Sequence, residues 1–376
     1  MSELNALYRR IDELLELRAR DFPQRVEPTW SRLRAALDEL TERLRAAAED
    51  DHGDPPAVSE ELLDSPVFLV GYPKSGTTLL LGLLDGHPEL AVVPGETRYF
   101  TDLVPAAKGS RERLVDDLHG RFVPYLANPT GQSPFWLLGR PWEGEDGYLR
   151  FSRRLYTLAR AHPSRDPLAL LAATFAGPYN RAWVEKTPLH VDHVDEILAV
   201  YPRARFVQIV RDPRSTAASI RRFREHGWRL DPDEVVRGID RALAAALERP
   251  ARLGEGRYLV VRYEELVRST EPELRRIADF LGIGWNDVVL RPTLAGTEMR
   301  ANSAWLERRT VGEVHALSLG EPGAGLDRRV LRSVLATTGA NARALGYPLP
   351  EVRRGPFARR RESAGRGASP PPRAEP

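Results

Sequence analysis

The stretch of residues 67–78 constrains the fold more than any other part of the chain. It reads Val-Phe-Leu-Val-Gly-Tyr-Pro-Lys-Ser-Gly-Thr-Thr and runs into a leucine-rich stretch, which predicts a buried strand, a turn with two glycines and a helix over residues 76–86. The backbone amides of such a turn and the positive end of the helix dipole converge on an anion, and the hydroxyls of Thr77 and Thr78 add donors. The segment therefore predicts a phosphate-binding turn in an α/β fold.

The turn departs from the common nucleotide-binding loop G-x-x-x-x-G-K-[ST]. Gly71 and Gly76 have its spacing, but the second glycine is followed by Thr77, and the lysine lies inside the turn at Lys74. A kinase needs its lysine after the second glycine, and Mg²⁺ to neutralise a transferred group of charge about −2. A sulfuryl group in its ester carries less charge, so a lysine aimed at the bridging oxygen could serve without a metal. A Mg²⁺-dependent kinase or nucleotide hydrolase, a non-catalytic nucleotide-binding scaffold and an ordinary surface turn stay open as alternatives.

Short apolar runs followed by helical patterns recur along the chain. The runs lie at residues 67–70, 90–93, 183–184, 206–210 and 258–261, and the later helices are expected over residues 190–201, from residue 213, and over residues 272–281. Strands that alternate with helices indicate a parallel sheet covered by helices on both faces. We therefore predict an α/β domain over residues 61–350.

Three other regions flank or interrupt this domain. Apolar residues at helical spacing predict a helical extension within residues 1–60, formed by two helices with Pro23 and Pro28 between them. Residues 101–180 predict a mostly helical insertion over the carboxyl edge of the sheet, and residues 351–376 a disordered basic tail. The aromatic side chains of the insertion fit either an apolar lid over an acceptor or ordinary core packing; they are Trp136, Trp142, Tyr148, Phe151 and Phe175.

Composition excludes several classes of protein. The chain has 55 basic and 53 acidic residues, and the tail alone carries seven arginines against three glutamates, so the remainder is close to neutral. No cysteine is present, which excludes disulfides and thiolate metal sites. The polar N-terminus lacks the apolar run of a secretory signal, and no stretch approaches the roughly 20 apolar residues of a membrane helix. We expect a cytoplasmic protein without an integral membrane segment and without a nucleic-acid partner.

A second anchor for an anion follows another predicted strand. Arg211 comes directly after the apolar run 206–210, at the strand end where open α/β sheets bind ligands. Asp212 suits the N-cap and Pro213 the first turn of the next helix. Arg211 and Ser219 could then hold a second phosphate at some distance from the first.

These two motifs together resemble the sulfotransferases that use 3′-phosphoadenosine 5′-phosphosulfate (PAPS). The resemblance implies a P-loop nucleotide-hydrolase-like sulfotransferase fold and no metal. It also implies that Arg211 and Ser219 hold the 3′-phosphate of PAPS and that the 72–78 loop holds the 5′-phosphosulfate. The loop residues expected to bind the cofactor are Lys74, Ser75, Gly76, Thr77 and Thr78.

Further segments are similar to a bacterial branch related to the tyrosylprotein sulfotransferases, and the resemblance covers about residues 65–320. It implies that Glu96, in Pro-Gly-Glu-Thr-Arg, is the catalytic base and that Lys186, in Glu-Lys-Thr-Pro, stabilises the transition state together with Lys74. It also implies that Tyr263 meets the adenine and that Ser303 assists catalysis. The basic residue that closes over the cofactor in this family has no clear counterpart after Ser303.

The residues themselves support these roles. Lys74 and Lys186 are two of only three lysines in an arginine-rich chain, and a compact ammonium can bridge transferring and leaving oxygens. Glu96 follows a predicted strand, where a general base is well placed, although an ion pair with Arg98 is an alternative role and His87 or Glu185 are alternative bases.

A cluster of histidines and aspartates after Pro188 could be read as a metal site, but helix geometry spreads its side chains over different faces. We therefore expect no metal; its members are His190, Asp192, His193 and Asp195. For the acceptor, the expectation is a hydroxyl of a small molecule, a glycan or a lipid. The oligomeric state cannot be read from the sequence.

Overall fold

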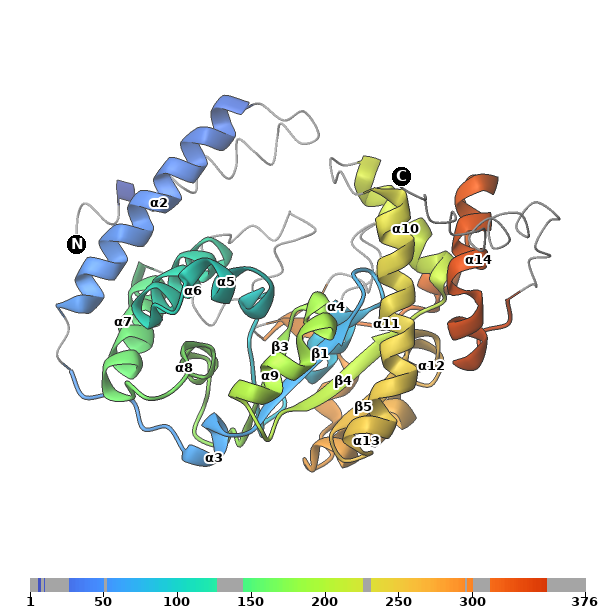
Figure 1. The fold of residues 1–376 in the computed structure, drawn as a ribbon. Coiled ribbons are helices and arrows are strands. Elements are labelled where there is room, and N and C mark those ends of the chain that lie inside the picture. Colours follow the sequence, from blue (N-terminus) through green and yellow to red (C-terminus); the bar gives the residue numbers. More distant parts are fainter. Residues whose placement is uncertain are drawn as a thin grey trace, which may run out of the picture.

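A wholly parallel five-stranded sheet forms the centre of the computed structural model, which describes residues 6–7, 10, 27–50, 53–126, 145–225, 231–294, 296–299 and 312–349. The strands lie in the order β2-β3-β1-β4-β5, of which Figure 1 labels all but β2. They are β1 (Pro66–Gly71), β2 (Leu90–Val92), β3 (Ala182–Lys186), β4 (Arg205–Val210) and β5 (Tyr258–Arg262). The predicted α/β class with a parallel sheet is confirmed, and each predicted strand agrees with an observed one to within two residues.

The helices before the third strand are α2 (Glu27–Glu49), α3 (Glu60–Leu63), α4 (Thr77–Leu84), a π-helical turn η1 (Tyr99–Leu103), α5 (Val104–Ala107), α6 (Arg111–Leu126), α7 (Glu145–Ala161) and α8 (Pro167–Thr174). After it follow the 3₁₀ turn η3 (Pro188–His193), α9 (Val194–Val200), α10 (Pro213–Glu225), α11 (Pro232–Leu253), α12 (Tyr263–Arg268) and α13 (Thr270–Leu281). The chain then forms η4 (Asp287–Leu290), the small strands β6 (Thr293–Leu294) and β7 (Thr297–Glu298), η5 (Ala316–Leu319) and α14 (Arg328–Ala344).

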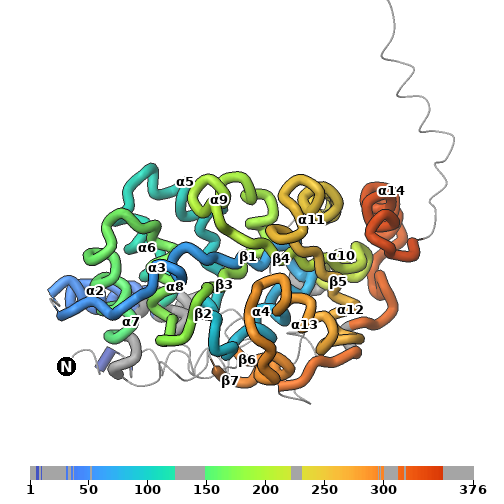
Figure 2. The backbone as a smooth tube through the Cα atoms, turned by 90° about the horizontal axis from the view of Figure 1, so that it is seen from below, coloured from blue at the N-terminus to red at the C-terminus, as the bar shows by residue number. Residues whose placement is uncertain are grey.

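Both faces of the sheet are buried, as the continuous apolar runs predict. Along β1, Phe68 and Val70 belong to an apolar cluster with α8, α9 and α11, whereas Val67 and Leu69 belong to a second cluster with α4 and α13. Figure 2 shows α9 and α11 on one side of the strands and α4 and α13 on the other. The side chains alternate between the two faces because successive residues of a strand point in opposite directions.

A layer of helices, α2, α6, α7 and α8, lies beside the sheet on the side of β2 and β3 (Figures 1 and 2). Helix α2 contacts α7 and α6 through small and leucine side chains one turn apart, namely Ala36, Leu40, Leu44 and Ala48, which are fully buried. The expectation that Pro28 separates two helices is wrong, because Pro28 lies in the first turn of α2, where its missing N–H has no helical partner to lose. Most of the other predicted N-terminal helix lies outside the described residues.

Helices α10, α11 and α14 pack together at the β5 end of the sheet. Helix α11 passes very close to the loop after β1, because Gly238 faces the ring of Tyr72. A β-carbon at Gly238 would lie 2.4 Å from Cε2 of Tyr72, so only glycine allows this approach.

All five strands are parallel, so their carboxyl ends meet at one edge of the sheet. The 72–78 loop, Glu96, Lys186, Arg211 and Tyr263 all lie at or shortly after these ends. Among the described residues, no helix is both long and apolar enough to cross a membrane.

The approach of α11 to Tyr72 predicts an unusual cost for a helix-favouring substitution. Alanine is better than glycine inside a helix by up to about 1 kcal/mol. We nevertheless expect Gly238→Ala to destabilise the protein, because overpacking of this kind costs roughly 1–3 kcal/mol. Calorimetric melting would show a lowered transition temperature.

Gly120→Ala is the matched control for that substitution. Gly120 lies inside helix α6, and a β-carbon there would sit 3.7 Å from Cγ2 of Thr41, an ordinary van der Waals contact. Gly120→Ala should leave the melting temperature unchanged or raise it. A similar response of both variants would contradict the tight approach of α11 to the loop.

Candidate functional site

The loop between β1 and α4 has the backbone of an anion cradle. Lys74 and Gly76 have positive φ angles of 73° and 113°, and the amide of Ser75 donates to the carbonyl of Tyr72 at 3.0 Å. Gly76 is the N-cap of α4 and offers no side-chain cap to the first helical amides. Two residues with positive φ turn the chain sharply, a backbone geometry in which the amides at a helix N-terminus can converge on an anion.

A buried hydroxyl in this loop fits an anionic ligand. Ser75 is 2% exposed, and its Oγ has no hydrogen-bond partner among the described residues. Leaving a buried polar group unpaired costs about 1–3 kcal/mol, which a phosphate oxygen would recover. Thr77 is buried and Thr78 is exposed. The loop residues expected to hold a phosphate are therefore compatible with that role.

Tyr263 links the loop to the second predicted anchor. A β-carbon at Gly76 would lie 2.3 Å from Cδ2 of Tyr263, whose side chain is almost fully buried. The guanidinium of Arg211 lies over the same ring, with Cζ 4.4 Å from its centroid, and Nη1 of Arg211 donates to the carbonyl of Lys74 at 3.2 Å. The structure therefore brings Arg211, Tyr263 and the loop together.

Ser219 lies on α10, two helical turns beyond Arg211, and is half-buried. The start of this helix is fixed by Asp212, whose carboxylate accepts from the amide of Arg214 at 2.8 Å and pairs with its guanidinium. The amide of Asp212 in turn donates to Glu264 at 2.9 Å. The predicted N-cap role of Asp212 is thus confirmed.

Glu96 and Lys186 form an ion pair at the same edge. Lys186 Nζ lies 2.6 Å from Oε1 of Glu96, with the lysine side chain 5% exposed and the glutamate side chain 39% exposed. Arg98, which follows closely in the sequence, pairs instead with Asp102 at 2.9 Å. The alternative of a Glu96–Arg98 pair is therefore wrong, and the carboxylate faces the one buried ammonium next to it while remaining open to solvent.

Lys74 lies within electrostatic reach of this pair. Burial lowers the pKa of its ammonium to about 7, the charge of Glu96 acts in the opposite direction, and the charge of Lys186 lowers it further. A lysine with such a pKa changes its charge near neutral pH, and an arriving anion would restore the charge. Two lysines and one carboxylate thus form a compact electrostatic unit beside the loop.

The other two candidate bases are occupied elsewhere. Glu185 is fully buried and accepts hydrogen bonds from Thr97, Thr187 and His190. Burial raises its pKa, but the neighbouring histidine and the hydroxyl donors outweigh this and hold the pKa below its usual value. His87 precedes β2, at the amino edge of the sheet, and its Nε2 lies 2.8 Å from the carbonyl of Gly284.

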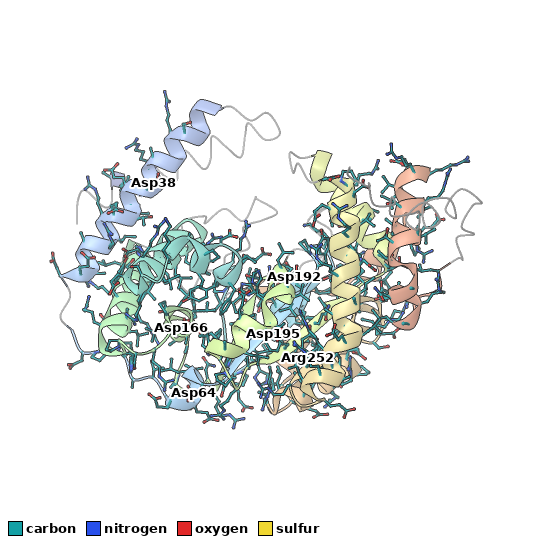
Figure 3. The ribbon with its side chains drawn as sticks, viewed as in Figure 1. Asp38, Asp64, Asp166, Asp192, Asp195 and Arg252 are labelled. Carbon is teal, nitrogen blue, oxygen red and sulfur yellow. The ribbon has the colours of Figure 1, made fainter. Side chains whose placement is uncertain are left out.

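Three of the four histidines and aspartates after Pro188 have partners within the protein. His190 binds Glu185, and His193 Nδ1 lies 2.8 Å from Glu196. Asp195 pairs with Arg252 at 2.7 Å, and both residues are labelled in Figure 3. In the part of the chain that the structure describes, no group of three or more histidine or acidic side chains is arranged to hold a metal ion.

Several sequence-based expectations lie outside the described residues. These are Ser303 with its neighbours, the aromatics Trp136 and Trp142, and the tail of residues 351–376. Of the other insertion aromatics, Phe151 is fully buried in the helical layer, and Phe175 packs beside it with ring centroids 5.7 Å apart. For these two rings, core packing is the observed role.

A sequence model of the sulfotransferase family matches residues 66–287, which is more than half of the chain. The chain therefore belongs to the sulfotransferase family. The match begins at β1 and includes the loop, Glu96, Lys186, Arg211 and Tyr263.

The chain is similar to several characterised relatives. It is 26% identical over 227 residues to a protein-tyrosine sulfotransferase of Drosophila melanogaster, with 60% of this chain and 39% of the relative covered. It is also 26% identical over 260 residues to the omega-hydroxy-beta-dihydromenaquinone-9 sulfotransferase Stf3 of Mycobacterium tuberculosis, covering 59% and 64%. The matches cover 39%, 51% and 58% of the length of the first three such relatives, so the chain spans only about half of them. Among solved structures, the sulfotransferase domain of the Synechococcus PCC 7002 olefin synthase has a TM-score of 0.46 at 19% identity, covering 80% of this chain and 98% of that one.

The low pKa of Lys74 predicts that anion binding takes up a proton. At about pH 8 most of the free protein carries neutral Lys74, and a bound phosphate raises the pKa again. Binding of adenosine 3′,5′-bisphosphate should therefore take up close to one proton at that pH, and its affinity should fall as the pH rises through about 7. Calorimetry in buffers of different ionisation enthalpy measures this uptake.

Lys74→Arg is the control for the proton uptake, because a guanidinium stays charged throughout this range. The variant should bind the bisphosphate with little proton uptake and with a flatter pH dependence. Equal uptake by the wild type and the variant would assign the titration to another group.

Proposed function

We propose that the chain transfers a sulfuryl group from PAPS to a hydroxyl acceptor, with Glu96 as the general base and Lys74 and Lys186 stabilising charge. One observation supports this most strongly. A partly open carboxylate, the buried Lys186 and the half-buried Lys74 lie within electrostatic reach of one another beside an anion cradle that contains an unpaired buried hydroxyl. A base and two point charges next to a phosphate-binding loop suit sulfuryl transfer better than a kinase, whose lysine would follow Gly76.

In this proposal, the loop and the second anchor bind opposite ends of the donor. We assign the 5′-phosphosulfate to the amides and hydroxyls of Lys74, Ser75, Gly76, Thr77 and Thr78. The 3′-phosphate falls to Arg211 and Ser219. Tyr263 supports both ends, because its ring contacts Gly76 and Arg211. When bound, PAPS supplies the sulfuryl group and leaves as adenosine 3′,5′-bisphosphate.

Glu96 performs the proton transfer in this proposal. Its carboxylate takes the proton of the acceptor hydroxyl as the oxygen forms its bond to sulfur, and the bond from sulfur to the bridging phosphate oxygen breaks. Lys186 donates to Oε1 of Glu96 at 2.6 Å, which orients the carboxylate, and in this proposal its ammonium offsets charge on the transferring oxygens. Lys74 is positioned in the loop to offset the charge that develops on the leaving phosphate oxygen. Ser303 is proposed to assist.

The acceptor is proposed only as a hydroxyl of a small molecule, a glycan or a lipid. The names of the two relatives above indicate tyrosine side chains for one and a hydroxylated menaquinone for the other, so the acceptor varies while the hydroxyl does not. A panel of a tyrosine-containing peptide, a prenyl alcohol and a disaccharide, each with PAPS, tests the proposed activity. Failure of every acceptor, with ATP and Mg²⁺ bound in preference to the bisphosphate, would favour a kinase.

Arg211 should contribute to the affinity for the donor and not to the rate of sulfuryl transfer. We expect Arg211→Ala to weaken binding of adenosine 3′,5′-bisphosphate by about 2 kcal/mol, the scale of a charged hydrogen bond. Isothermal calorimetry measures the change. Arg275→Ala is a matched control, because Arg275 also lies over an aromatic ring, 4.0 Å from the centroid of Trp285, but on α13. Equal losses in both variants would remove the second anchor from Arg211.

Glu96→Gln should show the opposite pattern. It keeps the shape of the side chain and removes its ability to accept a proton, so turnover should fall by about 10²-fold or more. Bisphosphate affinity should stay near that of the wild type. Glu271→Gln, which alters an exposed acid on α13, is the control and should retain full turnover. Undiminished turnover of Glu96→Gln would place the base elsewhere.

A further inference from the structure

We propose that Glu185 is a positioning residue, which through Thr97, Thr187 and His190 holds Glu96 in register with Lys186. These four side chains are called the clamp below. The inference rests on the proposed function, because it assigns a role in the reaction to residues that touch neither donor nor acceptor. All four are buried.

The clamp satisfies four successive backbone amides directly after Glu96. The bonds are Thr97 N to Glu185 Oε1 (3.3 Å), Arg98 N to Thr187 Oγ1 (3.0 Å), Tyr99 N to Thr97 Oγ1 (3.2 Å) and Phe100 N to His190 Nε2 (3.2 Å). No regular strand or helix supplies these acceptors, because the chain passes here from β2 through the left-handed Arg98 into η1. The path of the segment is thus set by side chains.

The carboxylate of Glu185 determines the direction of these bonds. Its Oε1 accepts the hydroxyl protons of Thr97 at 2.7 Å and of Thr187 at 2.6 Å. A hydroxyl has only one proton, so both oxygens are left as acceptors for the amides of Tyr99 and Arg98. Oε2 lies 2.9 Å from Nδ1 of His190. With the proton on Nδ1, the other ring nitrogen is free to accept from Phe100.

Only an ionised carboxylate can serve all of these donors. A glutamine at position 185 would point its NH₂ group either at the Thr97 amide or at His190. In the first orientation, the NH₂ group of the glutamine faces the amide of Thr97, and two donors cannot bond to each other. The second forces the proton of His190 to Nε2, where it faces the amide of Phe100. Every arrangement therefore leaves one buried amide without an acceptor.

The clamp is joined to the site by strand β3. Glu185 and Lys186 are adjacent, so their side chains leave the strand on opposite faces. Lys186 holds Glu96 by the 2.6 Å pair, and Glu185 holds the residues that follow Glu96. The ring of His190 is fixed edge-on between Phe68 and Phe100, at 6.1 and 5.4 Å. A displacement of about 1 Å in a reacting group can cost 10²-fold in rate.

The test compares Thr97→Val with Thr97→Ser. Valine has the shape of threonine but neither donates to Glu185 nor accepts from Tyr99, whereas serine keeps both bonds. With the acceptor that gives turnover, Thr97→Val should lower kcat by about 10- to 100-fold while bisphosphate affinity and the acceptor KM change little. Thr97→Ser should recover most of kcat.

Thr338→Val controls for the loss of any buried threonine hydroxyl. Thr338 is fully buried on α14 and donates to the carbonyl of Val334 at 2.7 Å, with no bond to the clamp. It should keep kcat even if it melts lower. Equal falls in kcat for Thr338→Val and Thr97→Val would overturn the proposal, because a general loss of stability would then explain both.

A double-substitution cycle distinguishes two roles of the clamp, namely positioning of Glu96 and direct participation in catalysis. If Thr97 acts only by placing Glu96, adding Thr97→Val to Glu96→Gln should not lower the residual turnover further. A full additional loss in the double variant would overturn the proposed route through Glu96.

Hydrogen exchange of the backbone amides tests the clamp independently of any sulfotransferase activity. The amides of residues 97–100 should exchange slowly in the wild type and in Thr97→Ser, and faster in Thr97→Val and Glu185→Gln. Faster exchange without a fall in kcat would overturn the positioning role. If no acceptor is sulfated at all, the proposed function fails, and equal exchange in Thr97→Val and Thr97→Ser would then refute the clamp as well.

Discussion

The parallel pairing of β1 with β3 and β4 is the constraint on which the rest of the site depends. It brings the loop after β1, Lys186 at the end of β3 and Arg211 after β4 to one edge, although they are far apart in the chain. A slip of one residue in β3 would exchange Glu185 and Lys186 between the two faces. The buried carboxylate would then meet the space beside the loop, and the ammonium would be buried among aromatic rings. The register of β3 therefore determines which of these two side chains faces the loop.

Tight contacts around the loop explain why glycine is needed at two positions, one in the loop and one on α11. Gly76 makes room for Tyr263, and Gly238 on α11 makes room for Tyr72. Each contact places an aromatic ring against the backbone, so the loop is supported from two sides before any ligand arrives. Such preorganisation lowers the ordering cost of binding. Lys74 adopts a left-handed backbone within this support, which fixes where its side chain starts.

The parts of the site that local sequence specifies could be predicted, and the parts that tertiary contacts specify could not. Buried strands and a glycine turn are visible in the order of residues, so the sequence predicts the loop and Arg211 at the edge where the structure has them. The partner of Glu96 was not visible, because a nearby arginine competes with a lysine 90 positions away. From the sequence alone, Glu185 is only an alternative candidate for the general base. Its hydroxyl and histidine partners in Thr187 and His190 stand close by in the sequence, yet only the fold brings Thr97 to them.

The bond from Arg211 to the carbonyl of Lys74 has a consequence for which ligands the site can select. It joins the guanidinium at one end of the site to the backbone at the other, so the separation of the two anchors is set by covalent structure and one short contact. In the proposed function, the pair acts as a chelate for a molecule with two anionic groups at a matching spacing. Once one group is bound, the other is presented at high effective concentration. A molecule with a single anionic group gains none of this advantage, however strongly it is charged.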